Sequence, residues 1–350
     1  MKKRIIDLVI VLCLIIFTFG CNKDDNSNNN GKQWYDLGSI DVNRFAVTLC
    51  SDPTGNIYAA GFTDANDIYY VAKWNGKTWS KVGSLTSNSC IYYLSSDLDG
   101  NIYASGNLVD NADTYYYLAK WDGTTWTDLG LHDAYGGNML ISVTDKSGNL
   151  FATSTNGPGD DVYAYIGETS WSNLGSINPN NSITSICSDG NGKIYEMLYS
   201  NSLYPPVIAV HQNGVWTELP ALTTNVNNYI RTSCTDSKGN LYVAGDLYDN
   251  TTKKYYVGKW NGSSWTKLHG LNGDVQSICV DPQGNLYAAG SMSFGTSGFD
   301  VAKWDGSKWV DLGNLDSKIK NHAICSDRNG AIYVEGTFND TYDNLIKVYK

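Results

Sequence analysis

The decapeptide DPQGNLYAAG at residues 281–290 returns with small changes along the whole chain. Close copies are DPTGNIYAAG at 52–61, DLDGNIYASG at 97–106 and DSKGNLYVAG at 236–245, and weaker copies begin at residues 145, 189 and 327. The shared glycine recurs at residues 55, 100, 148, 192, 239, 284 and 330, in steps of 45, 48, 44, 47, 45 and 46 residues. Seven units of about 46 residues have the length of β-propeller blades, which span about 40–50 residues.

One repeat unit predicts four antiparallel strands separated by turns. In the first turn, Asp52 can accept hydrogen bonds from the backbone ahead of it and Gly55 can adopt positive φ. The pair Asn75-Gly76 is a strong hairpin signal between two apolar runs. The four expected strands of this unit lie at 45–51, 57–61, 69–74 and 77–83. The fold class is therefore all-β, a seven-bladed propeller of four-stranded blades.

The two ends of the chain predict how the ring closes. A tryptophan in the fourth strand recurs in every unit, and its first occurrence, Trp34, precedes any complete blade. At the other end, LIKVYK at 345–350 stops at a third strand, with Tyr349 where most units have tryptophan. We expect the N-terminal strand to complete the last blade, because this pairing removes two open sheet edges.

Composition agrees with this fold and excludes one class of partner. The chain has 25 Tyr, 11 Trp and 35 Gly but only 7 Pro, a mixture that favours strands and turns. Its net charge is −10, and removal of residues 1–20, which carry +2, leaves −12. An acidic chain without a Lys/Arg run repels phosphate backbones, so we expect no nucleic-acid partner.

These motifs also carry a resemblance to known repeat families. VDPQGNLYAAG and CSDPTGNIYAAGFTDANDIYYVAKW resemble the SBBP type of seven-bladed propeller repeat, and they are similar to NHL repeats. GVWTELPAL at 214–222 resembles a kelch repeat, with a single glycine in place of the kelch double glycine. The resemblance covers nearly all of the chain after residue 33. It implies a fold but no single activity, because such propellers include binding scaffolds, sensors and enzymes.

The N-terminus has the build of an export signal. A basic start, an apolar run and Gly20 precede Cys21, which resembles the cleavage site of bacterial lipoproteins, although Phe19 departs from the small residue usual there. We expect a signal peptide at 1–20, a lipidated Cys21 with a flexible tether at 21–32, and the propeller at 33–350. The following Asn-Lys-Asp-Asp resembles an export signal for the outer membrane, so the predicted location is the exterior face of that membrane. A soluble secreted or periplasmic protein is the alternative.

Repeated cysteines and aspartates have a structural interpretation. Five cysteines occupy one equivalent position two residues before the turn aspartate, and neighbouring blades hold such positions too far apart for disulfides. The turn aspartates recur once per blade, as expected for a residue that forms the turn. No zinc, phosphate-loop or hydrolase motif is present, so we expect neither a metal nor a cofactor. The cysteines are Cys50, Cys187, Cys234, Cys279 and Cys325.

A position near the start of the first strand differs in every blade, in contrast to the constant turns. A residue kept only for packing would retain its type, so this position and its neighbours are candidates for ligand binding at the axis. Two of the three arginines after the signal peptide lie in this zone. The expected hydrogen-bond donors for carboxylates or dense hydroxyls are Arg44, Arg231, Gln276 and His322, with Tyr92 or Tyr229 as a stacking surface. Drift on a solvated rim is the alternative explanation.

The expected function is non-catalytic binding by a monomer tethered to the membrane, with a glycan or a protein as ligand. The absence of a reactive motif favours this interpretation over catalysis. The alternative is a polysaccharide-active lyase or hydrolase with an axial active site, where Arg, His and Tyr would act on a sugar acid. A third interpretation is an interaction platform that uses its circumference.

We predict that Cys21→Ala releases the protein from membranes, because the lipid is attached at Cys21. Membrane fractionation and immunoblotting measure this release. Retention of the variant in the membrane fraction at the wild-type level would mean that the apolar segment itself holds the chain in the bilayer.

Overall fold

The computed structural model describes most of the chain after residue 32. The described residues are 33–39, 48–63, 69–85, 87, 91–109, 114–131, 141–155, 160–167, 170–178, 180–199, 204–292, 300–314, 323–337 and 344–350. The predicted signal peptide, Cys21, the tether, Arg44 and His322 lie outside these ranges. Within the ranges, no helix has the length and apolar character needed to cross a bilayer.

The described strands form seven antiparallel sheets, which we number as blades 1 to 7. Blade 1 contains β2 (Thr48–Ser51), β3 (Ile57–Thr63), β4 (Tyr69–Trp74) and β5 (Trp79–Lys81). Blade 2 contains β6 (Ile91–Ser96), β7 (Ile102–Val109), β8 (Thr114–Trp121) and β9 (Trp126–Asp128). Blade 3 contains β10 (Ser142–Thr144), β11 (Leu150–Thr155), β12 (Asp160–Tyr165) and β13 (Trp171–Gly175). Blade 4 contains β14 (Ser182–Ser188), β15 (Ile194–Tyr199), β16 (Val207–Gln212) and β17 (Val215–Glu218). Blade 5 contains β18 (Tyr229–Thr235), β19 (Leu241–Asp246), β20 (Tyr248–Asp249), β21 (Lys254–Trp260) and β22 (Trp265–Leu271). Blade 6 contains β23 (Val275–Val280), β24 (Leu286–Gly290), β25 (Asp300–Trp304) and β26 (Trp309–Asn314). Blade 7 contains β27 (Ile324–Ser326), β28 (Ile332–Thr337), β29 (Asn344–Tyr349) and β1 (Trp34–Ser39).

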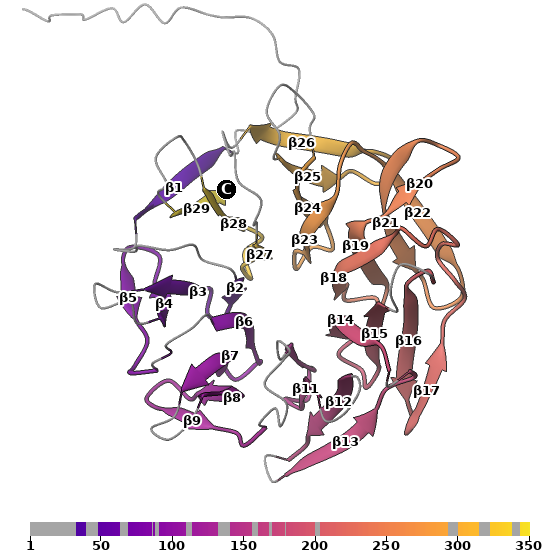
Figure 1. Ribbon diagram of the computed structural model, residues 1–350. Coiled ribbons are helices and arrows are strands. Elements are labelled where there is room, and N and C mark those ends of the chain that lie inside the picture. Colours follow the sequence, from indigo (N-terminus) through magenta and orange to yellow (C-terminus); the bar gives the residue numbers. More distant parts are fainter. Residues whose placement is uncertain are drawn as a thin grey trace, which may run out of the picture. The chain divides into compact units, whose positions relative to one another are not determined.

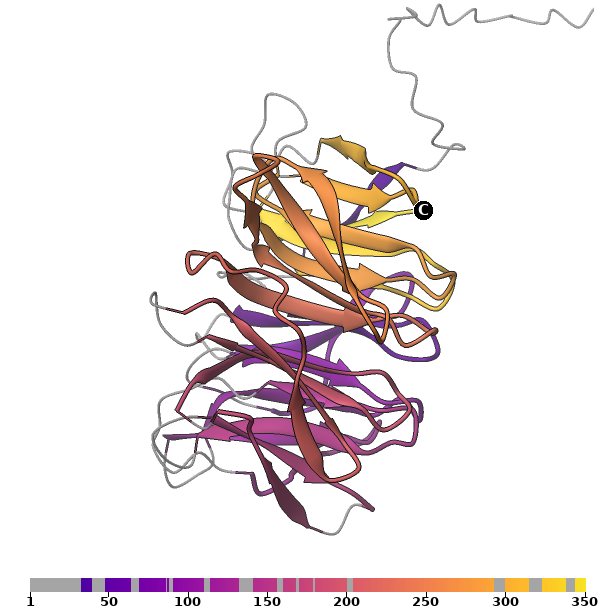
Figure 2. The ribbon, with the colours of Figure 1, turned by 90° about the vertical axis from the view of Figure 1, so that its right-hand side faces the viewer.

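The seven blades are arranged in a ring around a central axis, with the first strand of each blade innermost (Figure 1). The side view shows neighbouring blades packed face against face around this ring (Figure 2). Blade 5 differs from the predicted four strands because β20 pairs with β21 and adds a short fifth strand. The predicted seven-bladed propeller is confirmed.

Ring closure also follows the prediction. β1 pairs antiparallel with β29, and Trp34 lies opposite Tyr349. The Gln33 amide donates to the Lys350 carbonyl at 3.2 Å, which extends the pairing by one residue. Strands from the two ends of the chain therefore share blade 7 (Figure 1).

Each turn aspartate is a buried acceptor that holds the turn between the first two strands. In blade 1, Asp52 Oδ1 accepts from the backbone amides of Thr54 and Asn56, and Oδ2 accepts from the Asn56 amide group and the Tyr58 hydroxyl. These bonds lower the pKa of Asp52 although its burial acts in the opposite direction. The structural interpretation of the aspartate repeat is thus confirmed.

Hydroxyl side chains link neighbouring blades beside the axis. The residue just before the turn aspartate carries a hydroxyl in six blades. In four of them it donates to the carbonyl of the equivalent residue in the preceding blade. These bonds, which we call the hydroxyl ladder, span 2.6–2.8 Å and run from Ser51 to Ser326, Ser96 to Ser51, Thr144 to Ser96 and Thr235 to Ser188. Val280 occupies this position in blade 6 and interrupts the ladder.

Apolar side chains from adjacent blades form shared cores. In β3, Ile57 and Ala59 pack against side chains of blade 7, whereas Tyr58 and Ala60 pack toward blade 2. This alternation follows from the two-residue period of a strand buried on both faces. The five repeated cysteines are free thiols that are buried or half-buried, in agreement with their predicted packing role.

The fourth-strand tryptophans hold the outer edges of the blades together. Each packs on the aromatic or histidine ring across its hairpin, with centroids 5.0–5.6 Å apart. In six blades the indole Nε1 donates to a carbonyl of the preceding blade at 2.7–3.0 Å. Trp79 is the exception, because its buried Nε1 has no acceptor among the described residues. The interface between blades 7 and 1 therefore lacks one bond that the other interfaces have.

This difference predicts unequal effects of two matched substitutions. Trp34→Phe removes a bond from Nε1 to the Leu312 carbonyl, whereas Trp79→Phe removes an unsatisfied donor. We expect Trp34→Phe to lower the free energy of unfolding by at least about 1 kcal/mol more than Trp79→Phe. Urea denaturation followed by circular dichroism measures both. Equal losses in the two variants would contradict this account of the interface.

A buried carboxyl group lies between blades 3 and 4. The Glu196 side chain on β15 is fully buried, and its Oε1 accepts from the Ile177 amide at 2.8 Å. Its Oε2 has no partner among the described residues. Burial raises the pKa of Glu196 to about 7, and the nearby charge of Asp161 adds to the increase.

The raised pKa predicts that stability depends on pH. Glu196 ionises near its ordinary pKa in the unfolded chain and near 7 in the folded protein. Its contribution to the free energy of unfolding is therefore fully present below pH 4.5 and is lost as the pH rises through 7. The predicted loss is on the order of 3 kcal/mol. Burial also raises the pKa of Glu335, which adds its own pH dependence to the stability. The contribution of Glu196 is therefore the difference between the wild-type and Glu196→Gln profiles. Denaturation of wild type and Glu196→Gln between pH 4.5 and 8 should show a smaller decline in the variant, and parallel profiles would refute the assignment.

Candidate functional site

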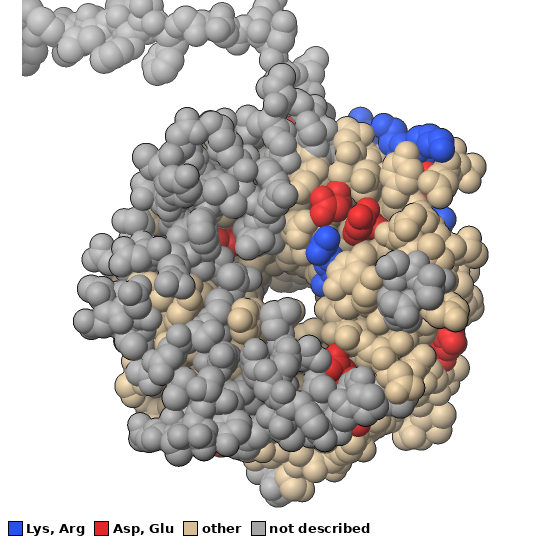
Figure 3. Space-filling model, viewed as in Figure 1, with Lys and Arg blue, Asp and Glu red and all other residues tan. Residues whose placement is uncertain are grey.

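The first strands enclose a channel along the axis of the ring. A cavity of about 560 Å³ lies at the end where these strands begin, and one of about 550 Å³ lies at the end with the turn aspartates. Ser188 and Thr235 line both cavities, so the two meet at the level of the hydroxyl ladder. Figure 3 shows the axial opening, with acidic and basic side chains at its edge.

The wall of the first cavity combines polar and apolar side chains and is largely uncharged. Several blades contribute hydroxyl groups, among them Thr48, Ser142, Thr184 and Ser277. Such groups can both donate and accept hydrogen bonds. Arg231 is the only charged side chain among the described residues that line this cavity.

Three of the predicted binding residues line the same cavity. Tyr92 of blade 2, Arg231 of blade 5 and Gln276 of blade 6 are all part of its wall. Tyr229 lies beside them, since its ring centroid is 5.0 Å from the Arg231 guanidinium carbon. The structure thus brings four of the six predicted residues to one end of the channel.

Arg231 and Gln276 share a carboxylate partner that was not among the predicted binding residues. Gln276 Nε2 donates to Asp274 Oδ2 at 2.5 Å, and Arg231 Nε lies 3.8 Å from the same oxygen. Arg231 belongs to β18 in blade 5, whereas Asp274 directly precedes β23 in blade 6. The carboxylate therefore joins two blades at the edge of the channel.

A second carboxylate lies next to this arrangement. Asp246 ends β19 and is paired in register with Tyr229. Burial and the charge of Asp274 raise the pKa of Asp246, while Arg231 opposes the increase. We call Tyr229, Arg231, Asp246, Asp274 and Gln276 the mouth cluster. When all its groups are ionised, it contains two negative charges and one positive charge.

Tyrosine rings surround the mouth cluster. Tyr229 meets Tyr199 edge to face with centroids 5.1 Å apart, and Tyr248 meets Tyr255 in the same way at 5.1 Å. Burial raises the pKa of Tyr255, and the charges of Asp246 and Asp274 raise it further, so these groups lie close together.

Another tyrosine contributes from blade 2. Burial and the proximity of Tyr229 raise the pKa of Tyr93 to about 12, and Tyr93 lines the cavity. Blade 2 and blade 5 lie on opposite sides of the ring (Figure 1). Aromatic side chains from both sides therefore approach each other near the channel mouth.

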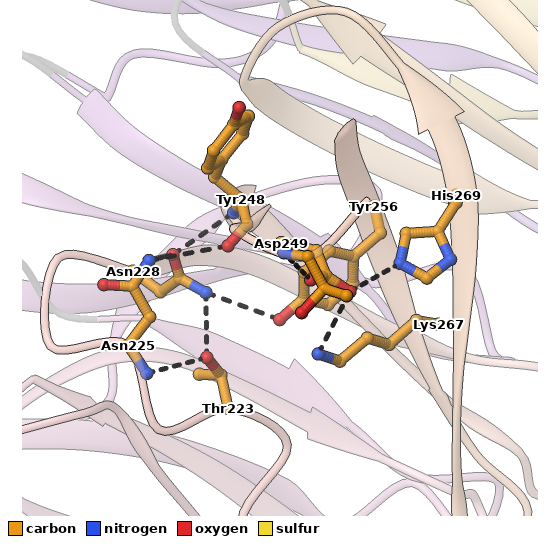
Figure 4. A network of polar contacts seen from close by, with 9 residues as sticks. Thr223, Asn225, Asn228, Tyr248, Asp249, Tyr256, Lys267 and His269 are labelled. Atoms are coloured by element: carbon orange, nitrogen blue, oxygen red, sulfur yellow. Dashed lines mark hydrogen bonds and ion pairs between the residues drawn. The ribbon is translucent and has the colours of Figure 1, made fainter. Parts of the chain in front are cut away.

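A polar network holds the blade 5 hairpin that carries Tyr248. Asn228 Oδ1 accepts from the Tyr248 amide at 3.2 Å, and Asn228 Nδ2 donates to the hydroxyls of Thr223 and Tyr256 at 3.0 and 3.4 Å (Figure 4). Asn228 is buried and directly precedes Tyr229. The network therefore fixes the hairpin relative to the strand that bears Tyr229 and Arg231.

The same hairpin is anchored at its outer end. Asp249 Oδ2 lies 2.9 Å from His269 Nε2 and 3.5 Å from Lys267 Nζ, both on β22 (Figure 4). Hydrogen bonds from the Thr251 amide and from His269 hold the pKa of Asp249 well below its usual range. This cluster lies on the outer strand of blade 5, away from the channel, and it stabilises the hairpin.

Sequence reasoning missed the residues that come from outside the first strands. Asp246 and Tyr255 lie on β19 and β21 of blade 5, and Tyr248 lies on the short strand β20 between them in sequence. No repeat position stood out there. A signal was present for Tyr93, because the equivalent residues of the other blades are small or aliphatic. Among the described residues, no cluster of three or more His, Cys, Asp or Glu side chains is arranged to bind a metal.

Comparison with known proteins extends only to the fold. No protein-family model and no curated protein sequence matches the chain. Solved structures similar to it include virginiamycin B lyase from Staphylococcus aureus, with a TM-score of 0.67, 12% identity, and coverage of 91% of this chain and 98% of that one. A streptogramin B lyase has a TM-score of 0.67 at 12% identity, with coverage of 92% and 99%.

A glycosidase is also similar. The GH74 xyloglucanase from Xanthomonas campestris has a TM-score of 0.56 and 15% identity, with coverage of 90% of this chain and 55% of that one. The virginiamycin B lyase has further been solved as a catalytically inactive histidine-to-alanine variant with quinupristin. At these identities the likeness extends to the seven-bladed propeller fold of this chain and no further.

Proposed function

We propose that this protein is a lipid-tethered binding propeller on the exterior face of the outer membrane, and that it binds a glycan at the channel mouth. The observation that carries the proposal is that Tyr92, Arg231 and Gln276 line one cavity. Sugars present many hydroxyl groups and flat apolar ring faces. A cavity wall of hydroxyl groups, one guanidinium and adjacent tyrosine rings is complementary to both features.

The size of the cavity favours a glycan over a folded protein as ligand. About 560 Å³ is within the range of pockets that enclose small ligands. A stable protein partner would instead bury about 800 Å² on each side, which requires a surface wider than the channel mouth. The proposed ligand is therefore an oligosaccharide or one end of a polysaccharide.

Catalysis at the same site is the second candidate function. Burial and the charge of Asp274 raise the pKa of Asp246, and Arg231 lies beside these two carboxyl groups, so the site contains a candidate general acid next to a guanidinium. This pairing favours a polysaccharide lyase or hydrolase over other enzyme classes. The similar solved structures include lyases and a xyloglucanase, so the fold is compatible with this alternative.

A glycan array followed by titration tests the proposal. The panel should contain neutral, acidic and amine-bearing oligosaccharides, with xyloglucan fragments and quinupristin included. We expect Arg231→Ala to weaken binding of the ligand at least tenfold, because charge-assisted hydrogen bonds contribute about 1.5–3 kcal/mol. Arg328→Ala is the matched control, since Arg328 lines the cavity at the opposite end and should leave affinity unchanged.

Two results would decide against this function. Equal loss of affinity in Arg231→Ala and Arg328→Ala would place the ligand elsewhere. New reducing ends or unsaturated products after incubation with the bound glycan, lost in Asp246→Asn, would show that the site is catalytic.

A further inference from the structure

We propose that Asp274 is an internal anion that occupies the anion-binding position of Arg231 and Gln276, so that the site selects uncharged hydroxyl-bearing sugars and excludes sugar acids. The inference rests on the proposed function, because it names the class of glycan that the channel mouth accepts. It also changes the expected ligand, since the sequence alone had suggested that Arg231 and Gln276 could bind a carboxylate.

One oxygen of Asp274 accepts a hydrogen bond from Gln276 and lies at ion-pair distance from Arg231. Gln276 Nε2 is 2.5 Å and Arg231 Nε is 3.8 Å from Asp274 Oδ2. An amide and a guanidinium that converge on a carboxylate oxygen form the arrangement that proteins use to bind carboxylate ligands. In this protein the carboxylate is supplied by the chain itself.

The main chain around Asp274 leaves little freedom for it to move away. A Cβ atom on Gly290 would collide with the Asp274 carbonyl oxygen, and one on Gly273 would collide with the Ser291 carbonyl. Strands β23 and β24 therefore approach closely at this point, which requires glycine. The backbone at Asp274 is thus held by tight packing, and the hydrogen bond from Gln276 orients its carboxylate.

Charge strengthens the exclusion of an acidic ligand. Asp246 is close enough to Asp274 to have its pKa raised by it, so a sugar carboxylate would face two carboxyl groups and only one guanidinium. Figure 3 shows acidic side chains beside a basic one at the axial opening. Displacement of Asp274 by a ligand would leave its own charge unpaired, which is costly in a partly buried site.

A neutral sugar hydroxyl group, in contrast to a carboxylate, can bind at the mouth cluster without displacing Asp274. Among the described residues, no hydrogen bond is made to Asp274 Oδ1 or by the Nη groups of Arg231. A sugar hydroxyl can donate to the first and accept from the second without displacing either residue. The Arg231 side chain is 41% exposed and that of Asp274 24%, so both are accessible to a ligand in the channel mouth.

A matched pair of probes tests the inference. Galactotriose and trigalacturonate differ in having hydroxymethyl or carboxylate groups at equivalent positions, and both are titrated against the full mature chain in detergent. We expect wild type to bind trigalacturonate more weakly than galactotriose. Asp274→Asn should improve the affinity for trigalacturonate relative to galactotriose at least tenfold, and added NaCl should diminish the gain.

Two further variants control for indirect effects. Arg231→Ala combined with Asp274→Asn should abolish the gain, because the freed donor is then absent. Asp246→Asn should shift the preference in the same direction by a smaller factor, since it removes charge without freeing a donor. Thermal unfolding of each variant, followed by circular dichroism, establishes that the fold is retained.

The outcomes separate this inference from the proposed function. If wild type binds a neutral glycan but Asp274→Asn gains no affinity for trigalacturonate, the inference is overturned and the binding function stands. If wild type binds no glycan but Asp274→Asn acquires affinity for trigalacturonate, the internal anion is established and the glycan-binding function fails. An unchanged preference in both Asp274→Asn and Asp246→Asn overturns the inference whatever the wild type binds.

Discussion

The carboxylate of the turn aspartate is the interaction on which the channel depends. In each blade this carboxylate accepts hydrogen bonds from the backbone amides of its own turn. In most blades it also accepts a hydrogen bond from a tyrosine hydroxyl of the second strand. This fixes the end of the first strand, and the preceding hydroxyl then reaches the neighbouring blade in the hydroxyl ladder. Where a ladder bond is present, the first strands of the two neighbouring blades are thereby held at one height beside the axis. The opposite ends of the same strands can vary in sequence because the scaffold does not depend on them.

The sequence was sufficient for the parts of the structure that repeat. The glycine spacing predicted the blade number, and the incomplete units at Trp34 and Tyr349 predicted how the ring closes. Both inferences depend only on backbone pairing, which the period determines. The position that varies at the start of the first strand was also informative, because register alone places Tyr92, Arg231 and Gln276 on the channel wall.

The composition of the candidate site could not be predicted in the same way. Asp274 was visible in the variable zone, but its distance to Arg231 depends on how two blades pack and on side-chain conformations. Asp246 and Tyr255 reach the mouth cluster from other strands of blade 5, where the extra strand β20 changes the shape of the hairpin. Sequence separation carries no information about such contacts. The structure places Arg231 and Gln276 at the channel mouth and adds carboxylates beside them that were not among the predicted residues.

Closure by β1 has a consequence for the order of events during folding. The strand that emerges first has its partner, β29, at the last residues of the chain. Until those residues are available, β1 cannot form its native pairing and the face of blade 1 that packs on blade 7 stays uncovered. Contacts of such long sequence separation form late in folding, and open edges promote association between chains. Ring closure is therefore the step that ends this exposure.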